Sequence, residues 1–185
     1  MINLEGYKFD SQNLGQRSIG DMLEDIVKFA YRDLSDLEGS NWEDAPTVRS
    51  IQDFSVDHIL YDVKTTDLDR DFSMPNLISA KRLIKLYSIP ENELRYVLVS
   101  YKEIDGTKII TKYEERPIET IPWSHLGIQN LGEGQIQLLT AKTIPLYEGT
   151  RDEWIAELKT RMLIYLDHTI EKMHKRKIYW SSLIA

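Results

Sequence analysis

Residues 53–64 have the sequence DFSVDHILYDVK, and this stretch decides how the rest of the chain is interpreted. Two short extended runs, within residues 48–56 and 59–65, are separated only by Asp57-His58, which predicts a hairpin. A turn at that point places Asp53 opposite Asp62 on the neighbouring strand. Side chains alternate between the two faces of a strand, so the hairpin has one apolar face and one polar face.

The polar face is predicted to gather two carboxylates and a lysine, because Asp53, Ser55, Asp62 and Lys64 share it. Carboxylates directly opposite each other on paired strands repel. A hard divalent cation removes that repulsion, and Mg²⁺ prefers carboxylate oxygen. Lys64 lies two residues from Asp62, so its side chain points to the same face of the strand. There it can orient or deprotonate a metal-bound water. An isolated Asp-x-Lys is usually a solvated strand position, and the opposed Asp53 is what favours the metal site.

The composition predicts one folded domain over residues 1–185, with 42% apolar and 29% charged residues. The chain has no cysteine, which excludes disulfides, zinc-thiolate sites and cysteine nucleophiles. Its four histidines form no His-x₃-His pair, so a histidine-rich metal site is not expected either. The net charge of −7 argues against a general polyanion binder. It does not exclude DNA binding, because bound divalent cations offset acidic residues.

We expect a cytoplasmic protein. The first ten residues lack the apolar core of a signal peptide, and no apolar run reaches the length of a membrane span.

Apolar periodicity predicts three helices. The first covers residues 18–37 and ends at Gly39, the second covers 75–87 with Ser73 as its cap, and the third covers about 150–176. The third begins with the capping box of Thr150 and Glu153 and has an apolar stripe from Trp154 to Met173. Further strands are expected at residues 95–101, 108–113 and 135–140. This order predicts an α/β (α+β) fold with a central mixed β-sheet flanked by helices.

The hairpin resembles the active-site segment of the PD-(D/E)xK nucleases, and within them type II restriction endonucleases. Asp62-Val63-Lys64 is similar to the (D/E)xK half, and Asp53 to the first acidic residue, although Gln52 stands where the family often has proline. The resemblance covers residues 18–101, the expected catalytic core. It implies a restriction-endonuclease-like core and Mg²⁺-dependent hydrolysis of double-stranded DNA.

The resemblance also implies roles for individual residues. Asp53 and Asp62 would bind Mg²⁺ together with the main-chain carbonyl of Val63, and Lys64 would polarise or deprotonate the attacking water. The family often takes a further acidic residue from the first helix. Glu24 beside the apolar stripe is the best match, although a solvated helix position would read the same way.

Candidate DNA contacts are less specific: they are Asn76, Ser79, Lys81, Gln135 and Gln137. The first two would lie near the start of the second helix, where free N–H groups favour a phosphate. The basic face that Lys81 forms with Arg82 and Lys85 is more often simply solvated. The glutamines could pair with adenine, or could be ordinary edge-strand residues. Residues 174–177, HKRK, could contact the DNA backbone or complement the helix dipole.

Cutting both strands at a symmetric site requires two active sites, so a homodimer is expected, with the C-terminal helix as a candidate interface. Two alternatives stay open. One is a structure-selective repair or recombination nuclease of the same fold, and the other is a DNA-binding module with an inert carboxylate pair.

Overall fold

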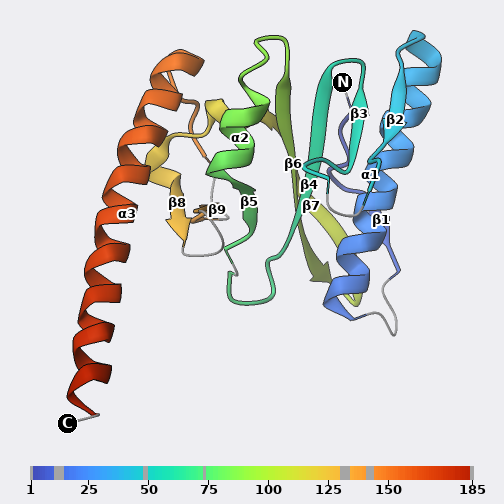
Figure 1. Ribbon diagram of the computed structural model, residues 1–185. Coiled ribbons are helices and arrows are strands. Elements are labelled where there is room, and N and C mark those ends of the chain that lie inside the picture. The colour runs from blue at the N-terminus through green and yellow to red at the C-terminus, as the bar shows by residue number, and fades with distance from the viewer. Residues whose placement is uncertain are drawn as a thin grey trace.

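The computed structural model describes residues 2–10, 15–47, 50–72, 74–129, 134–140 and 144–183. It contains a large and a small β-sheet, with one helix at each side of the molecule (Figure 1). The large sheet has the strand order β1-β7-β6-β4-β3-β2. Its strands are β1 (Lys8–Phe9), β2 (Trp42–Asp44), β3 (Phe54–Val56), β4 (Ile59–Asp67), β6 (Glu93–Ile104) and β7 (Thr107–Pro117). The sheet is mixed, because β4 and β6 are parallel while the other pairs are antiparallel.

The small sheet is antiparallel and has the order β5-β9-β8. Its strands are β5 (Asn76–Ser79), β8 (Leu126–Gln129) and β9 (Gln135–Leu138). The helices are α1 (Gln16–Glu38), α2 (Ala80–Leu86) and α3 (Arg151–Ser182), with two 3₁₀ turns, η1 (Ile118–Thr120) and η2 (Trp123–His125). None of the described helices has the length and apolar character needed to cross a bilayer.

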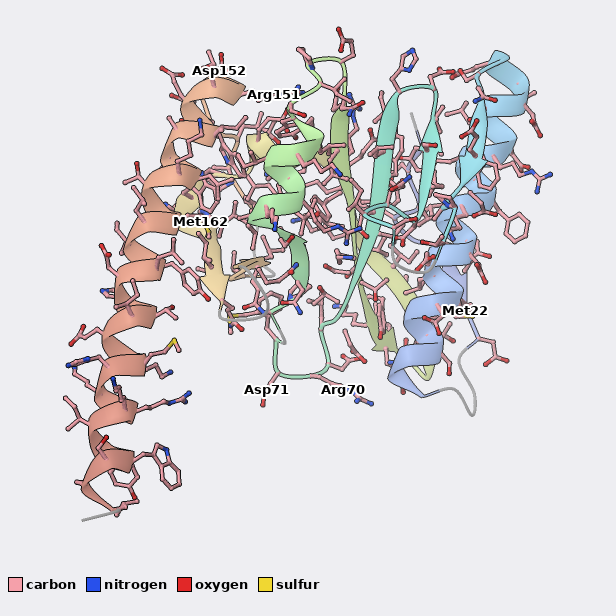
Figure 2. All side chains as sticks on the ribbon, in the orientation of Figure 1. Met22, Arg70, Asp71, Arg151, Asp152 and Met162 are labelled. Atoms are coloured by element: carbon pink, nitrogen blue, oxygen red, sulfur yellow. The ribbon has the colours of Figure 1, made fainter. Side chains whose placement is uncertain are left out.

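Each face of the large sheet has its own apolar core, and side chains fill both spaces (Figure 2). On one face, Leu23 and Val27 of α1 pack against Phe54, Tyr61 and other aromatic and β-branched residues of the sheet. On the opposite face, Leu94, Tyr96 and Leu98 of β6 share a core with α2, the small sheet and the first turns of α3. The alternation of side chains along β4 and β6 therefore decides which layer each residue enters.

The structure confirms a central mixed sheet flanked by helices. It also confirms the hairpin register, because Phe54 lies opposite Tyr61, and their rings stack with centroids 4.9 Å apart. Asp57 takes the left-handed conformation (φ 54°) that this two-residue turn needs. The first helix ends as predicted at Gly39, whose φ is 70°.

The prediction of a helix over residues 75–87 is wrong in its first third. Asn76–Ser79 is β5, and α2 begins only at Ala80, with the Ser79 hydroxyl accepting a hydrogen bond from the N–H of Arg82. The backbone of this segment pairs with β9, about sixty residues away in the chain, and local periodicity does not reveal such pairing. The expected cap Ser73 lies outside the described residues.

Other boundaries also differ. The extended run at residues 48–56 contributes only Phe54–Val56 to the sheet, and Val48 and Arg49 lie outside the described residues. The last expected strand ends at Leu138. The capping box at Thr150 is present, but α3 continues to Ser182, and of its predicted apolar stripe only Trp154 and Leu158 are buried. The small sheet as a separate layer was not predicted.

Candidate active site

Asp53 is fixed at the start of the hairpin by three hydrogen bonds. Its main-chain N–H donates to the carbonyl of Tyr61 (2.7 Å), and its own carbonyl accepts from Ala45 (3.1 Å). Its carboxylate Oδ2 accepts from the main-chain N–H of Val63 (2.7 Å). Asp53 thus lies level with Asp62, as the register predicts. Its carboxylate contacts the backbone of β4 between the Asp62 and Lys64 side chains.

Asp62 and Lys64 form an ion pair on β4, with the lysine Nζ 2.5 Å from Oδ2 of the aspartate. Both side chains point to the face of Leu60, away from α1, as alternation predicts. Burial raises the pKa of Asp62 to about 7, helped by the charges of Asp53 and Glu24, while Lys64 opposes the rise. Asp62 is only 7% exposed. Its charge partner, Lys64, lies two residues away on the same strand. Such a perturbed group beside a specific partner is a candidate functional residue.

Glu24 is held by an ion pair with Lys28, one turn later on α1, at 2.8 Å. Glu24, Lys28 and Asp53 all line a recess of about 220 Å³ between the middle of α1 and the segment that joins β2 to β3. Burial lowers the pKa of Lys28, but the ion pair with Glu24 and the charges of Asp44 and Asp53 outweigh it, so the net pKa is raised. The structure therefore brings Glu24 within electrostatic range of both aspartates, on the Asp53 side of the site.

Two residues beside the candidate site, Lys28 and Tyr96, were not predicted from the sequence. Lys28 follows Glu24 at the i,i+4 spacing of a helical ion pair, a signal that could have been used. Tyr96 lies beside Asp62 in the parallel register of β4 and β6 and is fully buried. Its hydroxyl has no hydrogen-bond partner among the described residues, and burial followed by the charge of Asp62 raises its pKa well above the usual range. Its sequence context, an apolar strand, gives no hint that its hydroxyl is buried near Asp62.

The side chains around the hairpin supply oxygen donors, the ligand type that Mg²⁺ prefers. In the part of the chain that the structure describes, no group of three or more His, Cys, Asp or Glu side chains is placed to share a metal ion. Asp53 and Asp62 supply two carboxylates, and Mg²⁺ in proteins is commonly held by one or two carboxylates together with waters. The carbonyl of Val63 points to the same strand edge as its N–H, which contacts Asp53.

Four of the five candidate DNA contacts lie together on β5 and β9. Asn76 faces Gln137 and Ser79 faces Gln135 in the antiparallel register. Gln137 is buried, and its side-chain nitrogen donates to the Asn76 side chain at 2.5 Å. Both glutamines lie on β9, the central strand of the small sheet, so the alternative that they are ordinary edge-strand residues is wrong. Lys81, the fifth candidate, is exposed on α2.

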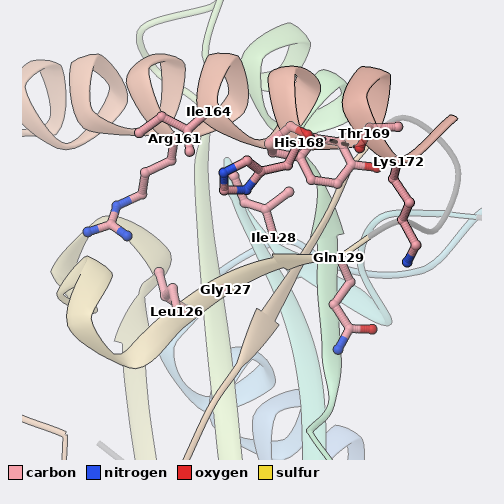
Figure 3. Close-up of a pocket in the computed structure, with 10 residues that line it drawn as sticks. Leu126, Gly127, Ile128, Gln129, Arg161, Ile164, His168, Thr169 and Lys172 are labelled. Atoms are coloured by element: carbon pink, nitrogen blue, oxygen red, sulfur yellow. Dashed lines mark hydrogen bonds between the residues drawn. The ribbon is translucent and has the colours of Figure 1, made fainter. Parts of the chain in front are cut away.

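A separate hollow of about 490 Å³ lies between β8 and α3 (Figure 3). Arg161, His168 and Lys172 line it from α3, and Gln129 lines it from β8. The described residues that line this hollow include no carboxylate. Residues 174–177 lie further along α3 and are all exposed.

The mixed sheet with the α1 helix on one face has a restriction-endonuclease-like fold. A comparison with solved structures found 39 matching chains. Among them, NlaIV restriction endonuclease is similar to this chain with a TM-score of 0.51 and 11% sequence identity, over 80% of this chain and 68% of that one. At that identity the likeness concerns the fold. No protein family matches the sequence, and no curated protein matches it.

Proposed function

We propose that this protein is a Mg²⁺-dependent endonuclease that hydrolyses phosphodiester bonds of double-stranded DNA at a specific site, as a type II restriction enzyme of the PD-(D/E)xK class. The observation that carries the proposal is the Asp62–Lys64 ion pair on β4, with the Asp53 carboxylate bonded to the residue between them. The similarity in fold to a restriction endonuclease supports it.

In this proposal each residue has a defined task. Asp53, Asp62 and the carbonyl of Val63 hold Mg²⁺, which when bound lowers the pKa of a water and offsets phosphate charge. Lys64 would orient the attacking water through its ammonium group, which lies at the Asp62 carboxylate, or, as the neutral amine, would take the proton of that water. Glu24, with Lys28, closes the other side of the site and fixes the position of the charged groups around Asp53.

DNA contacts are proposed for exposed and half-buried residues on the face of the sheet that carries Asp62. Asn76, Ser79, Lys81 and Gln135 belong to β5, α2 and β9, which cover that face. Gln137 supports this surface from within by orienting the Asn76 side chain. Duplex cutting requires two active sites, so we also propose a homodimer. We further propose that the protein acts in the cytoplasm.

Digestion of a plasmid of known sequence tests the proposal. The protein is incubated with the plasmid in Mg²⁺, in Mn²⁺ and in EDTA, and the ends produced are sequenced. Discrete fragments with one shared sequence at their ends, formed only with metal, are expected. Cutting confined to junctions or flaps would favour the structure-selective nuclease. Binding without cutting in either metal would favour the non-catalytic module.

A further inference from the structure

The second half of α3 extends beyond the rest of the protein (Figure 1). Its N-terminal turns pack beside β8 and α2, whereas the lower half of the helix extends past the small sheet and has no neighbour among the described residues (Figure 1). Every described residue from 170 to 183 is exposed. Most of the stability of a helix in a protein comes from packing of an apolar face, so a partner on this segment would stabilise it.

The exposed segment has a regular apolar pattern, which we call the α3 stripe. The stripe consists of Leu163, Leu166, Ile170, Met173, Lys177 and Trp180. The spacing alternates between three and four residues throughout, which is the a/d repeat of a coiled coil. Its five apolar members are 45–65% exposed. A contiguous apolar surface of this kind marks an interaction site.

We propose that the α3 stripe pairs with the α3 stripe of a second copy of this chain, with the two helices antiparallel. The a/d repeat is self-complementary, because each helix supplies both knobs and holes of the same size. The paired length from Leu163 to Trp180 is about 26 Å at the rise of an α-helix. The second copy therefore covers the apolar surface that the fold leaves open.

The position of Lys177 selects the antiparallel orientation. In a parallel, in-register pair, Lys177 would meet its own copy at a core position, where two ammonium groups repel. An antiparallel pair centred between residues 171 and 172 instead places Lys177 against Leu166 of the second copy, with Asp167 alongside. The ammonium group of Lys177 is then next to the carboxylate of Asp167, so this contact is complementary in charge.

In the antiparallel register, the end of each helix also contacts an apolar surface of the other copy. Trp180 of one copy comes level with Leu163 of the other. Leu163 borders a hollow of about 400 Å³ between α2 and α3, lined by Ile84, Leu158 and Met162. Met162 lies on α3 at the level of α2 (Figure 2). A buried tryptophan in such a hollow is the kind of anchor that dominates binding energy at interfaces.

The oligomeric state in solution tests the pairing. Sedimentation equilibrium without metal or DNA is expected to give a dimer for the full chain, and Ile170→Glu is expected to give a monomer with an unchanged sheet signal in circular dichroism. Ile178→Glu is the matched control, because Ile178 is equally exposed but lies off the stripe; it is expected to remain dimeric. A monomeric parent protein, or a dimeric Ile170→Glu, overturns the proposal.

Cysteine cross-linking tests the orientation, since the chain contains no cysteine of its own. A mixture of Leu166→Cys and Lys177→Cys proteins is expected to form a mixed disulfide dimer under mild oxidation. Leu166→Cys alone is expected to stay uncrosslinked, because the two cysteines would lie many turns apart in an antiparallel pair. Cross-linking of Leu166→Cys to itself would show a parallel pair and overturn the register.

The dimer stands apart from the proposed nuclease activity, since its test uses neither DNA nor metal. An inactive dimer would overturn the proposed nuclease activity and leave the α3 pairing, whereas an active monomer would overturn the α3 pairing and the proposed homodimer and leave the nuclease activity.

Discussion

The carboxylate of Asp53 accepts a 2.7 Å hydrogen bond from the main-chain N–H of Val63, the residue between Asp62 and Lys64. This bond ties the loop before β3 to the strand that carries the other two charged groups. It makes Asp53 both a structural clamp and a candidate metal ligand. The two roles are separable, because the clamp needs only an oxygen acceptor, whereas the metal prefers a charged oxygen.

Asp53→Asn is expected to keep the fold and lose metal affinity. The asparagine Oδ1 can still accept from Val63, and the substitution removes a charge that opposes Asp62. In EDTA its melting temperature should equal or exceed that of the parent protein. Added Mg²⁺ should stabilise the parent protein but should largely fail to stabilise the Asp53→Asn variant. Thermal melts with and without Mg²⁺ measure both effects.

Asp53→Ala is the control for the clamp. It leaves the Val63 N–H without its acceptor, a loss of about 1 kcal/mol of unfolding free energy. If Asp53→Asn melted as low as Asp53→Ala, the carboxylate charge itself would be stabilising, and the proposed repulsion with Asp62 would be wrong.

Lys64→Ala is expected to reduce Mg²⁺-dependent cleavage by about 100-fold or more, the usual effect of removing a general acid–base group. DNA binding should persist, because the alanine leaves the surface of β5, α2 and β9 unchanged. Initial cleavage rates and filter binding in Ca²⁺ separate the two quantities. Lys102→Ala, an exposed lysine on β6, serves as the charge-matched control and should cut normally.

The hairpin and its register could be predicted from the sequence because every signal involved is local. The turn residues, the alternation of apolar side chains and the positions of Asp53 and Asp62 all lie within twelve residues. The strand β5 could not, because its hydrogen bonds come from β9 and its buried Leu77 and Ile78 also fit a helical stripe. Local periodicity favours the helix, and long-range pairing overrides it.

The same limit applies to the surroundings of the site. The burial of Gln137 and of the Tyr96 hydroxyl depends on layers contributed by distant segments, so neither residue stands out in its own stretch of sequence. The Glu24–Lys28 pair was within reach of prediction, since its spacing is helical. Its position beside Asp53 was not, because it depends on how α1 crosses the large sheet.

Asp62 is expected to make the metal-free protein less stable as the pH rises. Burial raises its pKa to about 7, above the value of about 3.9 for a free aspartate, so the folded state holds the proton more tightly than the unfolded state. The proton-linked stabilisation is complete below the unfolded pKa and is lost as the pH rises through about 7. Mg²⁺ should restore stability mainly at the higher pH.

Urea unfolding of the parent and Asp62→Asn proteins in EDTA, from pH 5 to pH 8, measures this effect. The stability of the variant relative to the parent should increase across that interval. Asp36→Asn, an exposed carboxyl on α1, is the control and should show no such trend. A relative stability that stays flat between the two proteins would mean that Asp62 is charged throughout and is not the perturbed group.

Glu24→Gln is expected to lower the cleavage rate while leaving the fold intact. The substitution keeps the shape of the side chain but removes the partner charge of Lys28, whose ammonium group is then left to neutralise Asp53, the proposed metal ligand. The apparent Mg²⁺ affinity should fall with the rate. Asp25→Asn changes the adjacent, exposed carboxyl of the same helix and should cut like the parent. Equal rates for the two variants in a Mg²⁺ titration would remove Glu24 from the active site, because Glu24 differs from Asp25 in its ion pair with Lys28 and in its position in the recess beside Asp53.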